Sequence, residues 1–244
     1  MIWRTRIQDI VAPSLIDRVP RDHEETDRQF LRRRLVVAVA LVAGAVLLGF
    51  SLSIQPGDST FYALTGAVAV VWTVGGVAPG SLHLGYISFR GGRRRPIVTP
   101  FVTGLVAAAV FVAGALAVRE IPPLRDYVEN VLAHAQQGST ALIVVVTLAN
   151  SIGEEVFFRG ALFAAIGQRN AVVISTMVYA IATLATANPM LVFAALTLGV
   201  VFGLQRRASG GILAPIITHV TWSMIMLFAL PPLLACDPER LASV

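Results

Sequence analysis

Charged residues are scarce in this chain of 244 residues, because Asp, Glu, Lys and Arg together make up only 14% of it. A typical soluble domain carries about 25% charged residues, so this composition argues against a water-soluble globular protein. A disordered chain is excluded as well, since disorder requires low hydrophobicity and high net charge, whereas 56% of these residues are hydrophobic. The composition indicates a membrane protein.

Lysine and cysteine are also nearly missing. The sequence contains no lysine, and all 19 basic residues are Arg, which we attribute to coding bias rather than to chemistry. The single cysteine, Cys236, excludes an intramolecular disulfide and a zinc cluster built on cysteines. The first 34 residues lack the apolar stretch of a cleavable signal peptide, so we expect the first membrane span to act as an uncleaved signal.

Long apolar segments dominate the rest of the chain, and most are near the ~20 residues that a helix needs to cross a bilayer. They predict an all-α fold, a polytopic integral membrane helix bundle of about seven transmembrane helices. The predicted spans are Leu35–Ile54, Phe61–Pro79, Ile97–Val118, Ser139–Phe158, Ala171–Ala187, Met190–Leu204 and Gly211–Leu233.

The arginines are distributed unevenly between the ends of these spans. With the N-terminus inside the cell, 16 arginines lie on the cytoplasmic side, and only Arg119, Arg125 and Arg240 lie outside. Such a bias is the positive-inside pattern, and it predicts a cytoplasmic N-terminus and an external C-terminus. It also explains the net charge of +5 without a nucleic-acid partner; anionic lipid of the bilayer is the expected partner of these charges.

The N-terminal 34 residues allow two interpretations. Ile2, Trp3, Ile7, Ile10 and Val11 would share one side of a short helix lying on the membrane surface. Alternatively, the segment is a flexible cytoplasmic tail.

Ionisable residues within a membrane span are costly and are often functional, and one span contains a cluster of them. Glu154 and Glu155 are adjacent in the fourth predicted span, and Arg159 follows one helical turn after Glu155. Residues four apart share a helix face, so Glu155 and Arg159 are expected to pair, while Glu154 points about 100° away. We expect one neutralised carboxylate and one free to take a proton from water. Alternatively, the pair marks a helix end and reaches the headgroups.

A histidine occupies the last predicted span at a similar depth from the cytoplasmic side. His219 lies in this span, and Ser223 lies one turn further on the same face. Alone, His219 would be interpreted as a neutral histidine hydrogen-bonded between helices. Together with Glu154, it indicates a reactive site.

The run Glu154-Glu155-x-x-x-Arg159-Gly160, followed by a glycine-rich turn and an intramembrane histidine, resembles the CPBP family of intramembrane proteases. That family includes the type II CAAX prenyl endopeptidases and bacterial Abi-type proteins. The resemblance covers roughly Ser139–Leu230. It implies that Glu154 activates the attacking water, that Glu155 and Arg159 fill the other positions of this motif, and that His219 with Ser223 holds a metal or stabilises the oxyanion. Ser223 stands where the family has Asn or Asp.

The second family motif, FxxxH, is degenerate here. It falls on Tyr179 and Thr183, so a threonine replaces the histidine that positions or coordinates the catalytic water in the family. Thr is a poor metal ligand compared with imidazole. A divalent metal such as zinc is still one interpretation of the site, with Glu154 and His219 rather than Thr183 as candidate ligands. His23, His83 and His134 are expected to be solvated outside it.

The resemblance suggests a division of the chain. We expect a cytoplasmic segment at 1–34, three helices with their loops at 35–138, the core helices of protease type at 139–233 and a tail at 234–244. The leading hypothesis is an intramembrane endopeptidase of the bacterial plasma membrane, which cleaves a membrane protein or peptide near the cytoplasmic side. The alternative is a catalytically impaired pseudoprotease that acts as a membrane binding or scaffold protein. A small transporter or channel subunit is less supported, because the spans are apolar outside the Glu154 region.

Overall fold

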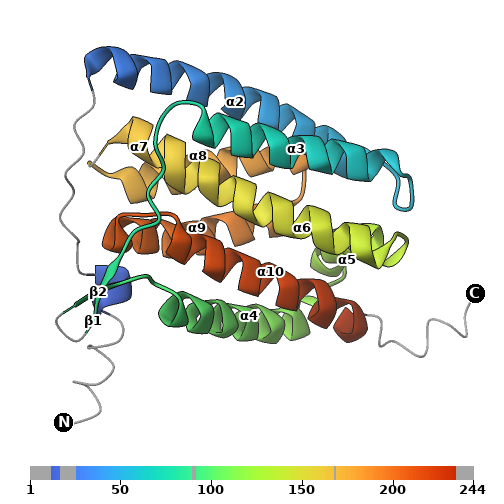
Figure 1. The fold of residues 1–244 in the computed structure, drawn as a ribbon. Coiled ribbons are helices and arrows are strands. Elements are labelled where there is room, and N and C mark those ends of the chain that lie inside the picture. The colour runs from blue at the N-terminus through green and yellow to red at the C-terminus, as the bar shows by residue number, and fades with distance from the viewer. Residues whose placement is uncertain (1–11, 17–25, 90–91, 168, 235–244) are drawn as a thin grey trace, which may run out of the picture.

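The protein is a bundle of helices with one short β-hairpin (Figure 1). The computed structural model describes residues 12–16, 26–89, 92–167 and 169–234. The long helices are α2 (Asp27–Ser53), α3 (Thr60–Val77), α4 (Val98–Val118), α5 (Pro122–Gln136), α6 (Thr140–Glu154), α8 (Ala171–Thr183), α9 (Pro189–Ser209) and α10 (Leu213–Leu234). The short elements are π-helical η1 (Ala12–Ile16) and η2 (Glu155–Leu162), α7 (Phe163–Ile166), 3-10 helix η3 (Leu184–Thr186), β1 (Ile87–Phe89) and β2 (Gly92–Arg94).

The apolar segments predicted from the sequence are all helical. In the described part of the chain, six helical stretches are long and apolar enough to cross a membrane, and one of them, Thr140–Ile166, runs continuously through α6, η2 and α7. The remaining predicted span corresponds to the shorter apolar stretch Ala171–Thr186, which at 1.5 Å per residue is about 24 Å long. The chain is a multi-pass integral membrane protein with an all-α bundle.

The first helix begins earlier than predicted. The sequence pattern placed its start at Leu35, but α2 begins at Asp27, so part of the expected N-terminal segment is helical. The reason is a capping box, in which the Thr26 hydroxyl accepts a hydrogen bond from the Gln29 backbone and the Gln29 side chain accepts one from the Thr26 backbone. The surface helix considered for Ile2–Val11 lies outside the described residues.

A helix between the third and fourth spans was missed. Helix α5 begins at Pro122, a residue type that favours the first helical turn. His134 on α5 is buried rather than solvated as expected, with 7% of its surface exposed. Its two ring nitrogens lie 3.1 Å and 2.9 Å from the carbonyl oxygens of Asn130 and Ile54, so it fixes α5 against the end of α2.

Close helix packing brings the motif-bearing helix into the centre of the bundle. In Figure 1 the stretch of α6 and α7 lies between α3 on one side and α10 on the other. A side chain at Gly76 of α3 would place its Cβ 2.7 Å from the carbonyl oxygen of Val156 in η2. Gly199 and Gly203 of α9 lie equally close to α8, since a Cβ at either would lie 2.9 Å from a side chain there. These two glycines therefore allow α9 to pack closely on α8.

Candidate active site

The acidic motif lies where the backbone changes from an α-helix to a π-helix. Helix α6 ends at Glu154 and η2 begins at Glu155. All eight residues of η2 are buried, and its Phe157 and Phe158 pack against Trp72 with ring centroids 4.7 Å and 5.0 Å apart. Single π-helical turns within α-helices are rare and occur frequently at functional sites.

Glu155 is held by two basic partners. Its Oε1 lies 2.9 Å from Nδ1 of His219 and 3.3 Å from Nη1 of Arg159. Both carboxylate and guanidinium side chains are fully buried. Arg159 also donates to the Gly199 carbonyl at 3.3 Å. Glu155 is therefore neutralised and fixed in position, as the spacing to Arg159 predicted.

The Arg159 guanidinium is enclosed by aromatic rings as well. Its central carbon lies 4.8 Å from the ring centroid of Tyr179 and 5.1 Å from that of Phe202. An aromatic face attracts a cation, more strongly when both are desolvated. This enclosure helps to hold a charge at the centre of an apolar bundle.

His219 is oriented by its neighbours on two sides. Its ring stacks on Phe202, with centroids 4.9 Å apart and planes 24° apart, and its Nδ1 faces Glu155. A carboxylate that accepts the Nδ1 proton fixes the histidine tautomer. Within the described part of the chain, Nε2 has no hydrogen-bond partner, so this nitrogen is left for another group.

Glu154 lies beside this cluster, but it is less buried than Glu155, and no basic side chain among the described residues is bonded to it. It is only partly buried, and its Oε2 accepts a hydrogen bond of 2.5 Å from the Tyr179 hydroxyl. His219, Glu155 and Arg159 are all within electrostatic range of it. The structure thus places Glu154 next to the pair formed by Glu155 and His219, a pairing that the sequence analysis did not predict.

Tyr179 is the site residue that the sequence analysis missed. The sequence analysis placed it at the first position of the FxxxH motif and gave it no role, but its hydroxyl is the hydrogen-bond partner of Glu154. The available signal was the extra hydroxyl itself, since a buried Tyr O–H usually has a partner. Thr183, which stands in place of the family histidine, donates to the Tyr179 carbonyl at 2.9 Å within its own helix.

Ser223 lies one helical turn beyond His219 and has a different partner. Its hydroxyl oxygen is 3.0 Å from that of Ser151 on α6, and both serines are buried. This hydrogen bond ties α10 to α6 next to the site.

Within the described part of the chain, the candidate ligands do not make up the ligand set of a zinc ion. Zinc in proteins takes three or four protein ligands. Among the described residues, no three His, Cys, Asp or Glu side chains are grouped as ligands. Of the two candidate ligands, Glu154 accepts from Tyr179, and His219 uses Nδ1 for Glu155.

The site lies within a region that is similar to a known protease family. Residues 136–225 match the family model described as Rce1-like, the type II CAAX prenyl endopeptidases. This range contains every candidate site residue from Glu154 to Ser223. This match supports a CPBP/CAAX protease family assignment for this part of the chain. No curated protein and no solved structure matches the chain.

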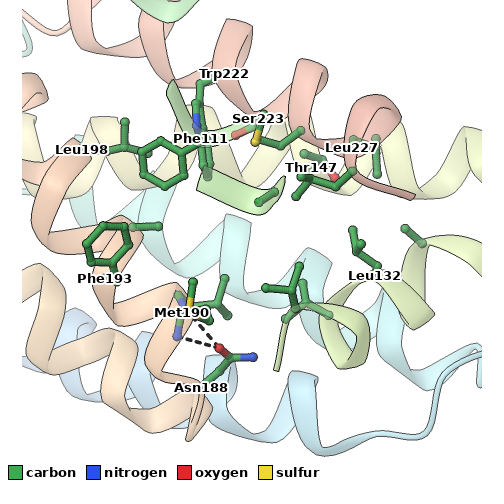
Figure 2. A pocket seen from close by; sticks show the side chains of 18 of the residues that line it. Phe111, Leu132, Thr147, Asn188, Met190, Phe193, Leu198, Trp222, Ser223 and Leu227 are labelled. Carbon is green, nitrogen blue, oxygen red and sulfur yellow. Dashed lines mark hydrogen bonds between the residues drawn. The ribbon is translucent and has the colours of Figure 1, made fainter. Parts of the chain in front are cut away.

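A large apolar cavity lies beside the Rce1-like motifs and has a volume of about 670 Å³. Its lining comes both from the Rce1-like region and from α4 and α5, which precede that region. Figure 2 shows Trp222 and Ser223 of α10 near Phe111 and Leu198 at one side of this space, with Asn188 and Met190 further along. Asn188 accepts hydrogen bonds from the backbone N–H groups of Met190 and Leu191 and donates to the Tyr127 carbonyl of α5 at 2.7 Å.

Proposed function

We propose that the chain is an intramembrane endopeptidase of CAAX protease type in which Glu154 activates the attacking water. The observation that carries this proposal is the difference between the two carboxylates. Glu155 is fully buried between Arg159 and His219, whereas Glu154 is partly exposed and accepts one hydrogen bond, from Tyr179. Only Glu154 is free to accept a proton from a water molecule.

The proposed reaction needs no covalent enzyme intermediate. The Glu154 carboxylate takes one proton from water, and the hydroxide attacks the carbonyl carbon of the scissile peptide bond. The tetrahedral intermediate then collapses, the C–N bond breaks, and Glu154 returns the proton to the leaving amine. General base catalysis of this kind contributes about 10²- to 10⁴-fold to a rate.

His219 is suited to stabilise the negative oxygen of the intermediate. Glu155 holds its Nδ1, and the carboxylate stabilises the positive charge of a protonated ring. Nε2–H can then donate to the oxyanion, in a site where a fixed donor is worth more than in water. Glu155 and Arg159 act as positioning residues, because they touch His219 and the helix backbone rather than the substrate.

The substrate class that fits is an apolar polypeptide within the lipid bilayer, since the lining of the adjoining cavity is almost entirely apolar. We place the protein in a bacterial plasma membrane because of its resemblance to Abi-type proteins and the positive-inside pattern of its arginines. Nucleic acid has no part in this proposal.

A pseudoprotease is the second candidate, and Thr183 is the observation that favours it. The Thr183 hydroxyl donates to the backbone of its own helix, so no imidazole is present at the position where the family has one. If the protein lacks activity for this reason, Thr183→His should create cleavage activity where the wild type has none.

The experiment compares membranes of cells that express the wild type or Glu154→Gln, by mass spectrometry of newly formed peptide N-termini. We expect new N-termini within apolar segments in the wild type only. Glu120→Gln is the matched control, because Glu120 is exposed and pairs with Arg119; it should cleave as the wild type does. Identical products from Glu154→Gln and the wild type would contradict the role of Glu154.

A further inference from the structure

Two adjacent polar residues of α9 are buried beside the candidate active site. Gln205 has no exposed surface and Arg206 is 6% exposed, although both lie on a helix that is long and apolar enough to cross a membrane. Polar side chains at such positions are costly and often functional. Neither residue belongs to the motifs that resemble the protease family, so the proposed function gives them no role.

Gln205 reaches the residue that precedes His219. Its Nε2 donates to the Thr218 hydroxyl oxygen at 2.8 Å, and that hydroxyl donates to the Pro100 carbonyl at 2.9 Å. Thr218, like Gln205, is fully buried. Two consecutive hydrogen bonds therefore join α9, α10 and α4 directly before His219.

Helix α4 is in direct contact with α10 at this level. A Cβ at Gly104 would lie 2.9 Å from the Thr218 carbonyl oxygen and 2.7 Å from the Cβ of Thr221, and the two helices lie side by side in Figure 1. Helix α4 precedes residues 136–225, which match the family model. The turn that carries His219 is thus held partly by a helix outside that region.

Arg206 holds the other half of the site. Its Nε donates to the Arg159 carbonyl at 2.6 Å, and its guanidinium carbon lies 5.3 Å from the ring centroid of Phe163. The guanidinium of Arg159 in turn pairs with Glu155. Arg206 therefore fixes the backbone of η2 at the residue that neutralises Glu155.

The two halves of the site must be placed accurately relative to one another. Glu155 and His219 are 64 residues apart in the sequence, and their side chains meet at 2.9 Å. A displacement of about 1 Å in an active site can cost about 100-fold in rate. Apolar side chains would pack α9 against its neighbours without the cost of burying polar groups, so what Gln205 and Arg206 add is directional bonding.

We propose that Gln205 and Arg206 are positioning residues of the site. Gln205 sets the position of His219 through Thr218, and Arg206 sets the position of Glu155 through Arg159. Neither contacts the substrate. The effect on the rate rests on the proposed function, whereas the effect on the position of His219 is measured without any substrate.

The ring nitrogens of ¹⁵N-histidine-labelled protein in detergent report on the position of His219. The signals of His219 are those that disappear in His219→Asn. We expect Gln205→Leu and Thr218→Val to shift these signals and Thr218→Ser, which keeps the hydroxyl, to leave them in place. The signals of His134 should not move, because its partners are the distant Asn130 and Ile54 carbonyls.

Unchanged His219 signals in both Gln205→Leu and Thr218→Val would overturn the proposal. The two variants remove the same hydrogen bond from opposite helices, so the test does not depend on the folding of one of them. If neither folds, the bond is a requirement of folding, and a positioning role is overturned as well.

Steady-state kinetics on a substrate identified as above measures the effect on the rate. We expect Gln205→Leu and Thr218→Val to lower kcat about 10- to 100-fold with little change in KM, and Thr218→Ser to restore it. Thr103→Val is the matched control, because the Thr103 hydroxyl donates within its own helix, to the Thr99 carbonyl at 2.8 Å. A kcat of Gln205→Leu equal to that of Thr103→Val would overturn the proposal.

A second set of variants tests Arg206. Arg206→Met should lower kcat by a similar factor at an unchanged KM, because it removes the donor to the η2 backbone. Arg206→Lys keeps a donor and should recover part of the loss. Arg93→Met is the control, since Arg93 is exposed on β2. Equal kcat values for Arg206→Met and Arg93→Met would overturn the role of Arg206.

The two kinds of measurement separate this proposal from the proposed function. If the His219 signals shift as expected but no protein, the wild type included, cleaves a peptide bond, the proposed function fails and the positioning of His219 stands. If the wild type cleaves and the signals do not shift, the protease proposal stands and the positioning role is overturned.

Discussion

The Glu155–Arg159 pair shows how charge is accommodated in the centre of this bundle. Both side chains are fully buried, and each has a second partner, His219 for the carboxylate and the Gly199 carbonyl for the guanidinium. We expect Arg159→Met to lower the free energy of unfolding by about 3–5 kcal/mol, because removing one partner leaves a buried charge uncompensated. Thermal or denaturant unfolding in detergent measures this.

Arg119 is the matched control for that substitution. It pairs with Glu120 at 2.8 Å, but the two side chains are 43% and 71% exposed. Exposed pairs contribute about 0–1 kcal/mol, so the free energy of unfolding of Arg119→Met should be close to that of the wild type. A similar small effect of Arg159→Met would mean that the buried pair does not stabilise the fold.

Tyr179 is expected to position the catalytic carboxylate. Loss of its hydroxyl in Tyr179→Phe removes the one hydrogen bond that Glu154 accepts from it, and a hydrogen bond to a charged group is worth about 1.5–3 kcal/mol. We predict that kcat falls about 10- to 100-fold, with little change in KM. Steady-state kinetics on a purified substrate provides both numbers.

Thr183→Ala serves as the control on the same helix, because the Thr183 hydroxyl donates to the backbone carbonyl of Tyr179 and not to Glu154. It should keep a kcat near that of the wild type. An unchanged kcat in Tyr179→Phe would show that the hydroxyl does not position Glu154.

The sequence indicated which residues form the site better than it indicated how they pair. The spacing of Glu155 and Arg159 correctly predicted their contact. It did not show that His219 would bond to Glu155, because the backbone becomes π-helical at Glu155 and an ideal α-helix no longer gives the directions of the side chains. The geometry of α8 then brings Tyr179, rather than Thr183, to Glu154.

At the scale of helices, glycines determine how closely α3 approaches the π-helical segment. Gly76→Ala would place a Cβ 2.7 Å from the Val156 carbonyl oxygen and 2.5 Å from its side chain. Because one of these neighbours is backbone, α3 and η2 must move apart. We expect a loss of about 1–3 kcal/mol of stability, typical of an overpacked contact, and a lower kcat because η2 carries Glu155.

Gly66→Ala provides the comparison on the same helix, since a Cβ there meets nothing within 4 Å. Alanine in an open helical position is favoured over glycine by about 0.5–1 kcal/mol, so this variant should be as stable as the wild type or more so. The free energy of unfolding of both variants, measured in detergent, tests this difference in stability. If Gly76→Ala were as stable as Gly66→Ala, this result would contradict the close packing of α3 on η2.

Helix α5 could have been found in the sequence from its apolar face. Val128, Val131, Leu132 and Ala135 recur at helical spacing and all line the cavity. The sequence analysis instead counted the segment among the loops that follow the third span, with Arg119 and Arg125 outside. Its docking depends on His134 and on Asn188 of a distant loop, and no local pattern predicts those contacts.

At the scale of the whole molecule, bilayer thickness made the spans predictable, since it fixes the length of each apolar segment. All seven predicted segments are helical in the structure. Their arrangement was not predictable in the same way. The cavity is formed by halves of several helices that are far apart in the sequence, and hydropathy does not indicate which helix halves meet.

The exposed apolar surface of α4 provides a test of membrane embedding. Val106 lies near the middle of α4 and is 59% exposed. In a bilayer this side chain faces lipid, so we predict that Val106→Asp costs about 2.5–3.5 kcal/mol for a charge at the centre of a span. The fraction of protein recovered in the membrane should fall, and Val106→Leu should be recovered like the wild type. Full recovery of Val106→Asp would contradict a lipid-facing position.

The most direct test of the central claim is hydrolysis by the purified protein in vesicles, in water enriched in ¹⁸O. The account predicts that the wild type cleaves its substrate and places one ¹⁸O atom in the new carboxyl group of each product. Glu154→Gln should fold normally and show no cleavage above background. Cleavage at the wild-type rate by Glu154→Gln would contradict the account.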